Sequence, residues 1–286
     1  MRRAGSKNLH RSAGTRETFR RVFVACEGHR SEIDYLRELL RQSEVLGLHG
    51  RVEVIILDRY ETDSGLSYPS HVIQMTADHM RYLSTGECSV RMFLSMVRSS
   101  AGENGRSAVK ALSHDPMFEM LCTGDRIGCI EEATEYAIGF MHERGFDVSL
   151  DFDDQMYDPR TDVVCIIIDR DAGKARPREN YQEFIESCDE KGFRLFVTNP
   201  KFEFWVLMHL DSIHDELMAI AGDRNPSAAT DRVMESRGLS KGDIDFEMIL
   251  GGLDTAMEHS KEFLLTPDRL EDTVGTNLPK FIDLLK

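Results

Sequence analysis

The chain lacks several features that would place it in well-defined classes of protein. No run of its 286 residues approaches the roughly twenty apolar residues of a membrane span, and no apolar segment typical of a secretory signal follows its basic beginning. Its six cysteines include no Cys-x-x-Cys pair, and its histidines show no zinc-binding spacing. It has neither a Walker loop nor a Gly-x-Ser-x-Gly elbow, so the sequence indicates neither ATP hydrolysis nor serine-hydrolase chemistry. We therefore expect a reduced, cytoplasmic protein that does not associate with membranes.

Basic residues are in the minority. The chain contains 35 Lys and Arg residues against 50 Asp and Glu residues, for a net charge of −15. Residues 1–21 hold seven basic residues and one acidic residue, so the remainder carries a charge of −21. This balance argues against a basic scaffold that coats nucleic acid. The basic N-terminal arm, residues 1–21, is either a phosphate-binding segment or, as its shortness favours, a solvated tail.

Short apolar runs alternate with amphipathic segments, which predicts an α/β fold with a parallel sheet flanked by helices. Residues 162–168 are apolar on both faces, as is typical of a central parallel strand. The expected strands are residues 21–26, 52–57, 162–168 and 193–198. The expected helices are a segment that begins with a capping box at Ser31, then residues 69–83, 178–191 and 200–210.

The alternation is interrupted once and then ends, which predicts five segments. Residues 1–21 form the arm, 22–84 the first part of the core, 85–160 a mostly helical insertion, 161–211 the second part of the core, and 212–286 a helical C-terminal region. The helices expected in the insertion are residues 90–98, 117–122 and 131–144. Those expected in the C-terminal region are residues 227–237 and 251–263, with a last helix after Asn277.

Carboxylates follow two of the expected strands. Glu27 and Gly28 close the first strand, and Asp169 and Asp171 close the strand at 162–168. Parallel sheets place ligands beyond the carboxyl ends of their strands, and alternation along an extended segment puts Asp169 and Asp171 on the same side. Converging carboxylates repel unless a cation lies between them, and hard oxygen ligands favour Mg²⁺ or Mn²⁺. The alternative, that these residues are loop positions or helix caps, stays open.

Four segments resemble the motifs of the RloB family. Residues 24–32 (VACEGHRSE), followed by Tyr35, resemble its opening pattern vCEGxxTE…Y, and residues 168–171 (IDRD) resemble its Asp-x-Asp strand end. Residues 199–209 (NPKFEFWVLMH) resemble NPxFExWxLxH, and Thr276-Asn277 resembles its closing TN segment. The motifs occur in the family's order from residue 21 to residue 286.

The resemblance implies a Toprim-like core and a metal-dependent nuclease of a bacterial anti-phage, abortive-infection system, usually encoded beside an ATPase partner. On this pattern Glu27 is the general acid/base or a metal ligand, Asp169 and Asp171 hold Mg²⁺, and Glu32 helps to bind a second metal. Two departures stand out. Glu27 and Asp169 are 142 residues apart, which the insertion explains, and His29 stands where an acid is commoner.

Other residues near these motifs are candidates for substrate contact. Arg170, Lys174 and Arg176 form a basic loop after the strand, either gripping phosphates beside the scissile bond or simply exposed to solvent. In the fourth expected helix, Asn199 suits the N-cap position and an apolar helix face indicates core packing. Asn199, Glu203 and His209 are second-tier site candidates because the family motif includes them.

The leading hypothesis is therefore an Mg²⁺- or Mn²⁺-dependent nuclease acting on DNA or RNA, recruited or activated by its ATPase partner. The alternative is a non-catalytic interaction subunit of such a defence complex, with the core retained as a scaffold. A haloacid-dehalogenase-type phosphatase also uses Asp-x-Asp, but that family has Thr or Val where this chain has Gly173. The sequence does not choose between DNA and RNA.

Overall fold

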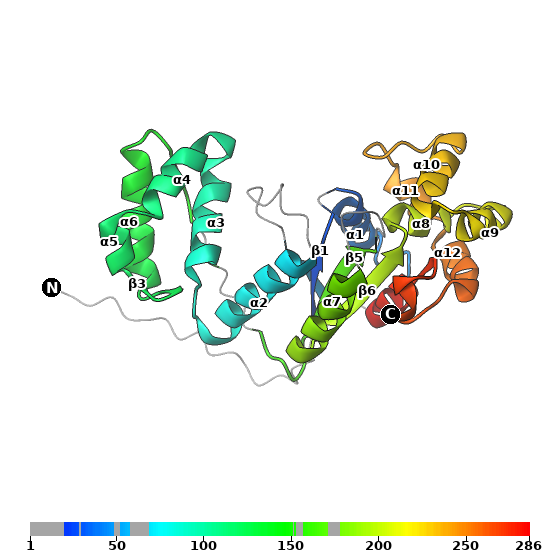
Figure 1. The fold of residues 1–286 in the computed structure, drawn as a ribbon, viewed down its shortest axis with the longest axis horizontal. Helices are drawn as coiled ribbons and strands as arrows, with labels where there is room; N and C mark the ends of the chain where they lie inside the picture. The colour runs from blue at the N-terminus through cyan, green and yellow to red at the C-terminus, as the bar shows by residue number, and fades with distance from the viewer. Residues whose placement is uncertain are drawn as a thin grey trace.

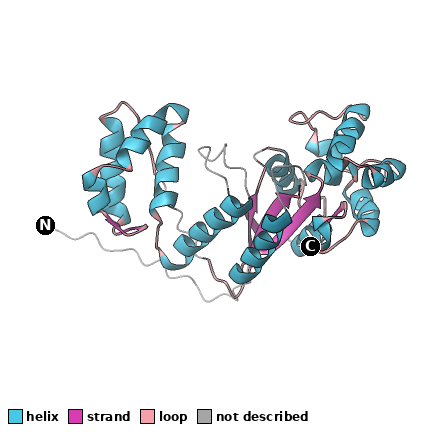
Figure 2. Ribbon diagram, in the orientation of Figure 1, coloured by secondary structure: helices cyan, strands magenta, loops and turns pink. Residues whose placement is uncertain are grey.

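The fold is seen in a computed structural model, which describes residues 20–28, 30–48, 52–57, 69–150, 152, 157–170 and 178–286 (Figure 1). A five-stranded sheet lies at its centre, with the strand order β2-β1-β5-β6-β7 (Figure 2). The strands are β1 (Arg20–Cys26), β2 (Val52–Ile56), β5 (Val163–Asp169), β6 (Arg194–Asn199) and β7 (Gly275–Thr276). All neighbours are parallel except β6 and β7, which pair antiparallel.

Strand β5 is central because its side chains are apolar on both faces. Val164 to Ile168 are all buried, and alternate residues contribute to the cores on opposite sides of the sheet. The same alternation holds for β1, where Val22 and Val24 face one core and Phe23 the other. These two strands pair in register, so their carboxyl ends meet at one edge.

Helices cover both faces of the sheet. Helix α1 (Ser31–Arg41) packs on one face together with the C-terminal helices, in a core that includes Trp205. Helices α2 (Pro69–Thr85) and α7 (Arg178–Lys191) contribute to the core on the other face. Among the described residues, no helix combines the length and apolar character that crossing a membrane requires.

The segment between α2 and β5 has a hydrophobic core of its own, built around Phe93, Leu112 and Phe118. It extends from the sheet as a separate helical lobe (Figure 1). Its elements are α3 (Val90–Ala101), η2 (Glu103–Gly105), α4 (Arg106–Leu112), α5 (Pro116–Met120), β3 (Cys122–Thr123), β4 (Arg126–Ile127) and α6 (Ile130–His142). The β3–β4 hairpin was not expected from the sequence.

The C-terminal region is helical and is tied back to the sheet by β7. Its elements are α8 (Phe202–Leu207), α9 (His214–Gly222), α10 (Pro226–Ser236), α11 (Phe246–Leu250), α12 (Leu253–His259), η3 (Ser260–Glu262), η4 (Arg269–Glu271) and α13 (Leu278–Leu285). Thr276 and Thr198 hydroxyls lie 3.0 Å apart, and the Asn277 side chain accepts from the Val197 N–H and donates to the Leu195 carbonyl. The closing Thr-Asn motif therefore holds the chain end against β6.

The expected α/β class, with a mostly parallel sheet and a helical C-terminal region, is confirmed. Two of the expected helices have different bounds in the structure. The helix expected at 200–210 is shorter because Asn199 is the last residue of β6 and Lys201 is the N-cap of α8. The helix expected at 251–263 ends as α12 and continues as the 3₁₀ turn η3. Arg21, the first residue of the strand expected at 21–26, lies in β1 and pairs with Asp162 at 2.8 Å; residues 1–19 lie outside the described part.

Candidate functional site

Two of the expected site residues, Glu27 and Asp169, meet where β1 and β5 end. The parallel register places Cys26 opposite Ile167, and the Glu27 N–H continues the ladder by donating to the Ile167 carbonyl at 2.8 Å. The Asp169 N–H in turn donates to Oε2 of Glu27 at 3.2 Å. Glu27 is only 5% exposed. Strand pairing thus brings together two residues that the sequence analysis linked only by their position after strands.

Glu32 joins this edge by folding back over Gly28. A Cβ atom at position 28 would lie 1.9 Å from Oε2 of Glu32, so only glycine leaves room for that carboxylate in its present place. Backbone N–H groups of Glu32 and Gly28 donate to it. The expected capping box was wrong: Ser31 is the first helical residue, and the N-cap residue, Arg30, provides no side-chain cap. Glu32 instead satisfies N–H groups at the start of α1.

Asp169 connects the strand edge to α8. Its Oδ1 accepts the N–H of Phe202, the first residue of that helix, at 2.8 Å. The N-cap residue Lys201 makes no side-chain capping bond of its own, so a carboxylate from the neighbouring strand takes over this role. The contact fixes the first turn of α8, which carries Glu203. Burial of the motif's apolar residues around Trp205 then holds the helix against α1.

Glu203 has a partner that the sequence analysis did not identify. Its carboxylate is 2% exposed, and Oε1 lies 3.1 Å from Nζ of Lys241, which belongs to the loop between α10 and α11. Oε2 is buried and has no hydrogen-bond partner among the described residues. Glu203 and Lys241 line a pocket of about 480 Å³ beside α10. No motif marked Lys241, because a lysine in a polar loop has no distinctive sequence pattern.

The three carboxylates of Glu32, Asp169 and Glu203, with Lys241, form what we call the acidic cluster. Burial raises the pKa of Asp169 well above its ordinary value, and repulsion from Glu32 and Glu203 adds to this shift. Burial also raises the pKa of Glu32, with a further contribution from Glu203. Partial burial of Lys241 opposes its charge, but the attraction of Glu203, Asp169 and Glu32 together outweighs this effect and raises the pKa of the ammonium group. The cluster therefore concentrates more negative charge than one lysine neutralises.

The acidic cluster fits a hard divalent cation by charge and by ligand type. The unpartnered Oε2 of Glu203 and the mutual repulsion felt by Asp169 are what such a cation would relieve. Within the described ranges, however, no three Asp, Glu, His or Cys side chains converge on one metal position. Each carboxylate has its own donor instead: backbone N–H groups for Glu32, Phe202 for Asp169 and Lys241 for Glu203. Asp171, the remaining expected ligand, lies outside the described residues.

The expected phosphate-binding residue Arg170 is buried rather than open to solvent. Its Nε donates to the Glu271 carbonyl at 2.9 Å, and its guanidinium carbon lies 4.7 Å from the centre of the Tyr181 ring. Only 4% of the residue is exposed. Arg170 therefore contacts η4 through Glu271 and α7 through Tyr181. Lys174 and Arg176, the other two expected substrate contacts, lie outside the described residues.

Asn199 has a structural position at the end of β6. Its amide nitrogen donates to the carbonyls of Leu270 and Thr273, at 2.8 and 3.1 Å. It precedes a cis bond to Pro200. These contacts hold the segment before β7 against the sheet, so the expected helix-capping role of Asn199 was wrong.

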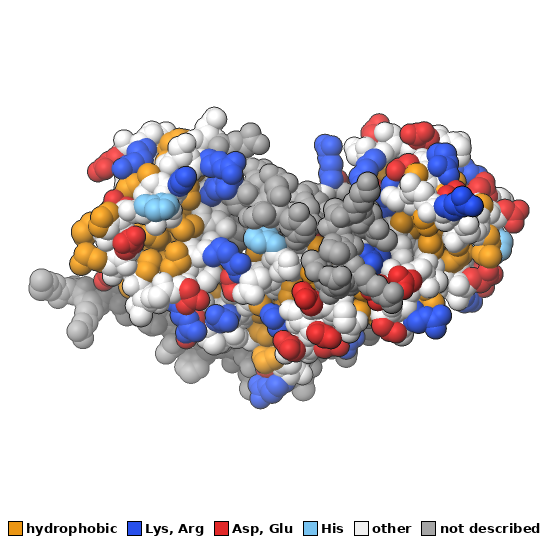
Figure 3. Space-filling view, in the orientation of Figure 1, with side chains coloured by type: hydrophobic (Ala, Val, Ile, Leu, Met, Phe, Trp, Pro, Cys, Tyr) orange, Lys and Arg blue, Asp and Glu red, His pale blue; other side chains and the backbone are white. Residues whose placement is uncertain are grey.

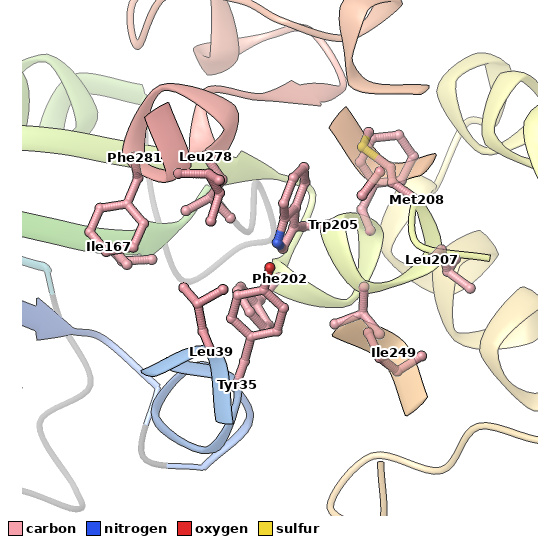
Figure 4. Packing of buried hydrophobic residues seen from close by; sticks show 14 of the residues in the cluster. Tyr35, Leu39, Ile167, Phe202, Trp205, Leu207, Met208, Ile249, Leu278 and Phe281 are labelled. Atoms are coloured by element: carbon pink, nitrogen blue, oxygen red, sulfur yellow. The ribbon is translucent and has the colours of Figure 1, made fainter. Parts of the chain in front are cut away.

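His209 lies in the core and not in the acidic cluster. Its Nδ1 lies 3.0 Å from the Trp205 carbonyl, and its Nε2 lies 3.2 Å from the Tyr35 hydroxyl. The first contact requires a proton on Nδ1, so Nε2 accepts from Tyr35. Burial lowers the pKa of His209 to about 4. Figure 4 shows Tyr35 and Trp205 pointing toward each other between α1 and α8, so three motif residues hold these two helices together.

Comparison with protein-family models identifies the family. A family model with the description RloB-like protein matches residues 22–285. The match includes residues 22–26 of β1, the acidic cluster, the insertion and β7. No curated protein and no solved structure gives a significant match.

Proposed function

The chain belongs to the RloB-like protein family, and on this basis we propose that it is a divalent-metal-dependent nuclease that hydrolyses phosphodiester bonds of DNA or RNA. We propose further that its core is Toprim-like and that it acts as the effector of an anti-phage, abortive-infection system with an ATPase partner. The observation that carries the proposal is the meeting of Glu27 and Asp169 at the carboxyl ends of two central parallel strands, beside Glu32 and Glu203.

Each residue has a chemical task in this proposal. Asp169, Glu32 and Glu203, with Asp171, would hold Mg²⁺ or Mn²⁺. The bound metal would supply charge stabilisation for a phosphoryl oxygen and the leaving oxygen. Glu27, held by the Asp169 N–H at the strand edge, would take the proton from the attacking water or return one to the leaving group.

A second candidate is a non-catalytic interaction subunit. The observation that favours it is Lys241, whose ammonium group already neutralises part of the acidic cluster. In this alternative the buried carboxylates and Lys241 would serve as an internal ion-pair network, and toxicity would come from the partner complex.

A cleavage assay separates the two. Purified protein would be incubated with plasmid, single-stranded DNA and total tRNA, in Mg²⁺, Mn²⁺ or EDTA, with and without the ATPase partner. We expect metal-dependent cleavage that falls by about a hundredfold or more in Glu27→Gln. Glu53→Gln is the matched control, because Glu53 is an exposed glutamate on β2, beside β1, and should retain activity.

The outcomes have distinct meanings. Cleavage lost in Glu27→Gln and kept in Glu53→Gln would support the nuclease and identify its polymer. An absence of cleavage in every reaction, with folded protein and the partner present, would overturn the nuclease proposal and favour the interaction subunit.

A further inference from the structure

A basic groove crosses the helical insertion between α3 and α4, away from the acidic cluster. Its lining residues are Val90, Arg91, Leu94, Ser95, Arg98, Arg106, Val109, Lys110 and Ser113. None of these described lining residues is acidic. Figure 3 shows basic side chains gathered over the α3 and α4 end of the insertion. We call this surface the α3–α4 groove.

The cations of the groove come from regularly spaced positions on two helices. On α3, Arg91 and Arg98 are seven residues apart, and on α4, Arg106 and Lys110 are four apart. Because an α-helix rises by 1.5 Å per residue, the two cations on α3 lie about 10 Å apart along the helix axis and the two on α4 about 6 Å apart. Successive phosphates of one strand rise by about 3.4 Å in a duplex, so the α3 pair spans about three nucleotides. Cations at this spacing can contact the regularly spaced phosphates of a nucleic-acid strand.

The positive charge of the groove is available to a ligand. Arg91 pairs with Asp78, but within the described part of the chain Arg98, Arg106 and Lys110 form no ion pair. Arg106 and Lys110 are exposed. Residues 90–112 hold four basic residues and one acidic residue, in a chain whose net charge is −15. A cationic groove on so acidic a protein points to an anionic partner.

The groove also has the chemistry expected for nucleic acid. Ser95 and Ser113 supply hydroxyl donors beside the cations, a combination that suits phosphate oxygens. In Figure 1, α3 and α4 belong to the helical lobe at one end of the molecule, away from α1 and α8, which carry Glu32 and Glu203. A polymer can occupy the groove and continue beyond it, whereas a short acidic peptide would fill the groove alone.

We propose that the α3–α4 groove binds the phosphodiester backbone of the nucleic acid on which this protein acts. That the bound nucleic acid is then cleaved rests on the proposed function; that it binds in the groove does not. The groove supplies positive charge on an acidic chain and contacts phosphates, while base identity is not read there.

The test measures binding without cleavage. Fluorescence anisotropy of labelled single-stranded DNA and RNA would be recorded in EDTA, over a range of salt concentrations, for wild type and for the triple variant Arg98→Ala/Arg106→Ala/Lys110→Ala. We expect the variant to bind about tenfold more weakly or worse at low salt. The slope of log affinity against log salt should fall in magnitude by about 2, from about 0.7 for each lost phosphate contact.

The matched control removes three exposed cations elsewhere, as Arg194→Ala/Arg224→Ala/Lys280→Ala, so that both triple variants change the net charge equally. This control should bind like wild type. Arg98→Lys/Arg106→Lys keeps the charges and should also bind, which guards against a folding defect in the alanine variant.

Three results would overturn the proposal. The first is a failure of wild type to bind nucleic acid at low salt, and the second is equal binding of nucleic acid by the groove and control variants. In the third, the groove substitutions would weaken binding of an acidic polypeptide and leave binding of nucleic acid unchanged. Because the assay contains EDTA, it gives the same answer whether or not the protein cleaves its ligand. Binding of nucleic acid without any cleavage would therefore support the groove proposal and overturn only the nuclease proposal.

Discussion

The backbone N–H of Asp169 donates a 3.2 Å hydrogen bond to Oε2 of Glu27, across 142 residues of chain. The bond exists because β1 and β5 are adjacent and parallel, so that the residues after Cys26 and Ile168 emerge at the same edge. The helical insertion lies between them in sequence but has its own hydrophobic core. The relative position of the two carboxylates is therefore set by strand pairing and not by the length of the insertion.

The first prediction concerns the charge of Asp169. In Asp169→Asn the amide oxygen can still accept the Phe202 N–H, while one of the three clustered negative charges is lost. We expect the metal-free variant to melt at or above the wild-type temperature, because repulsion is relieved. Mg²⁺ should stabilise wild type, by about 2.7 kcal/mol at a hundredfold excess over Kd, and should not stabilise the variant. Thermal melts in EDTA and in an Mg²⁺ titration provide the measurement.

Two controls make this result specific. Asp169→Ala also loses the acceptor for the Phe202 N–H and should cost about 1 kcal/mol of stability in EDTA. Glu53→Gln, on the exposed side of β2, should respond to Mg²⁺ like wild type. A wild-type Mg²⁺ response in Asp169→Asn would show that Asp169 is not a ligand.

The second prediction concerns the cation already present in the acidic cluster. Lys241→Met removes the ammonium group that lies 3.1 Å from Glu203 and attracts Asp169 and Glu32. A competing positive charge is lost, so Mg²⁺ should bind about threefold more tightly or better, as measured by isothermal titration calorimetry. The exposed Lys261, which pairs with Glu258, provides the control Lys261→Met, with unchanged affinity. Weaker Mg²⁺ binding in Lys241→Met would contradict this account.

The third prediction concerns pH. The pKa of His209 is about 4 in the folded protein and about 6.5 when it is unfolded, so between these values only the unfolded chain takes up the proton. His209 therefore contributes stability that is present above about pH 6.5 and is lost as the pH falls toward 4, up to about 3 kcal/mol. Urea unfolding across this range should show wild type losing more stability than His209→Gln.

The matched control for this pH experiment is His114→Gln. His114 is an exposed histidine after α4, so this variant makes the same chemical exchange outside the hydrophobic core. Parallel pH profiles for wild type and His209→Gln would mean that the pKa of His209 is the same in the folded and unfolded protein, contrary to the buried environment described above.

Much of the sheet could be predicted because its signals are local. The apolar run that became β5 and the amphipathic run that became α7 are specified by neighbouring residues, and the helix boundaries 178–191 agree with the structure. The start of α8 could not be predicted in this way. Asn199 and Pro200 look like a helix start, but pairing of β6 with β7 extends the strand through Asn199. Tertiary pairing here outweighs a local capping preference.

The sequence by itself determined the family, the α/β class and the acids after the first and third predicted strands, because motifs and periodicity are properties of neighbouring residues. Only the tertiary structure decided which polar groups share an environment. In the structure Lys241 pairs with Glu203, the Arg170 guanidinium packs against the Tyr181 ring, and His209 lies in the core beside Tyr35. The physical reason is that burial and charge–charge interaction depend on distances in space, which a loop lysine or a strand-end arginine does not reveal in its sequence.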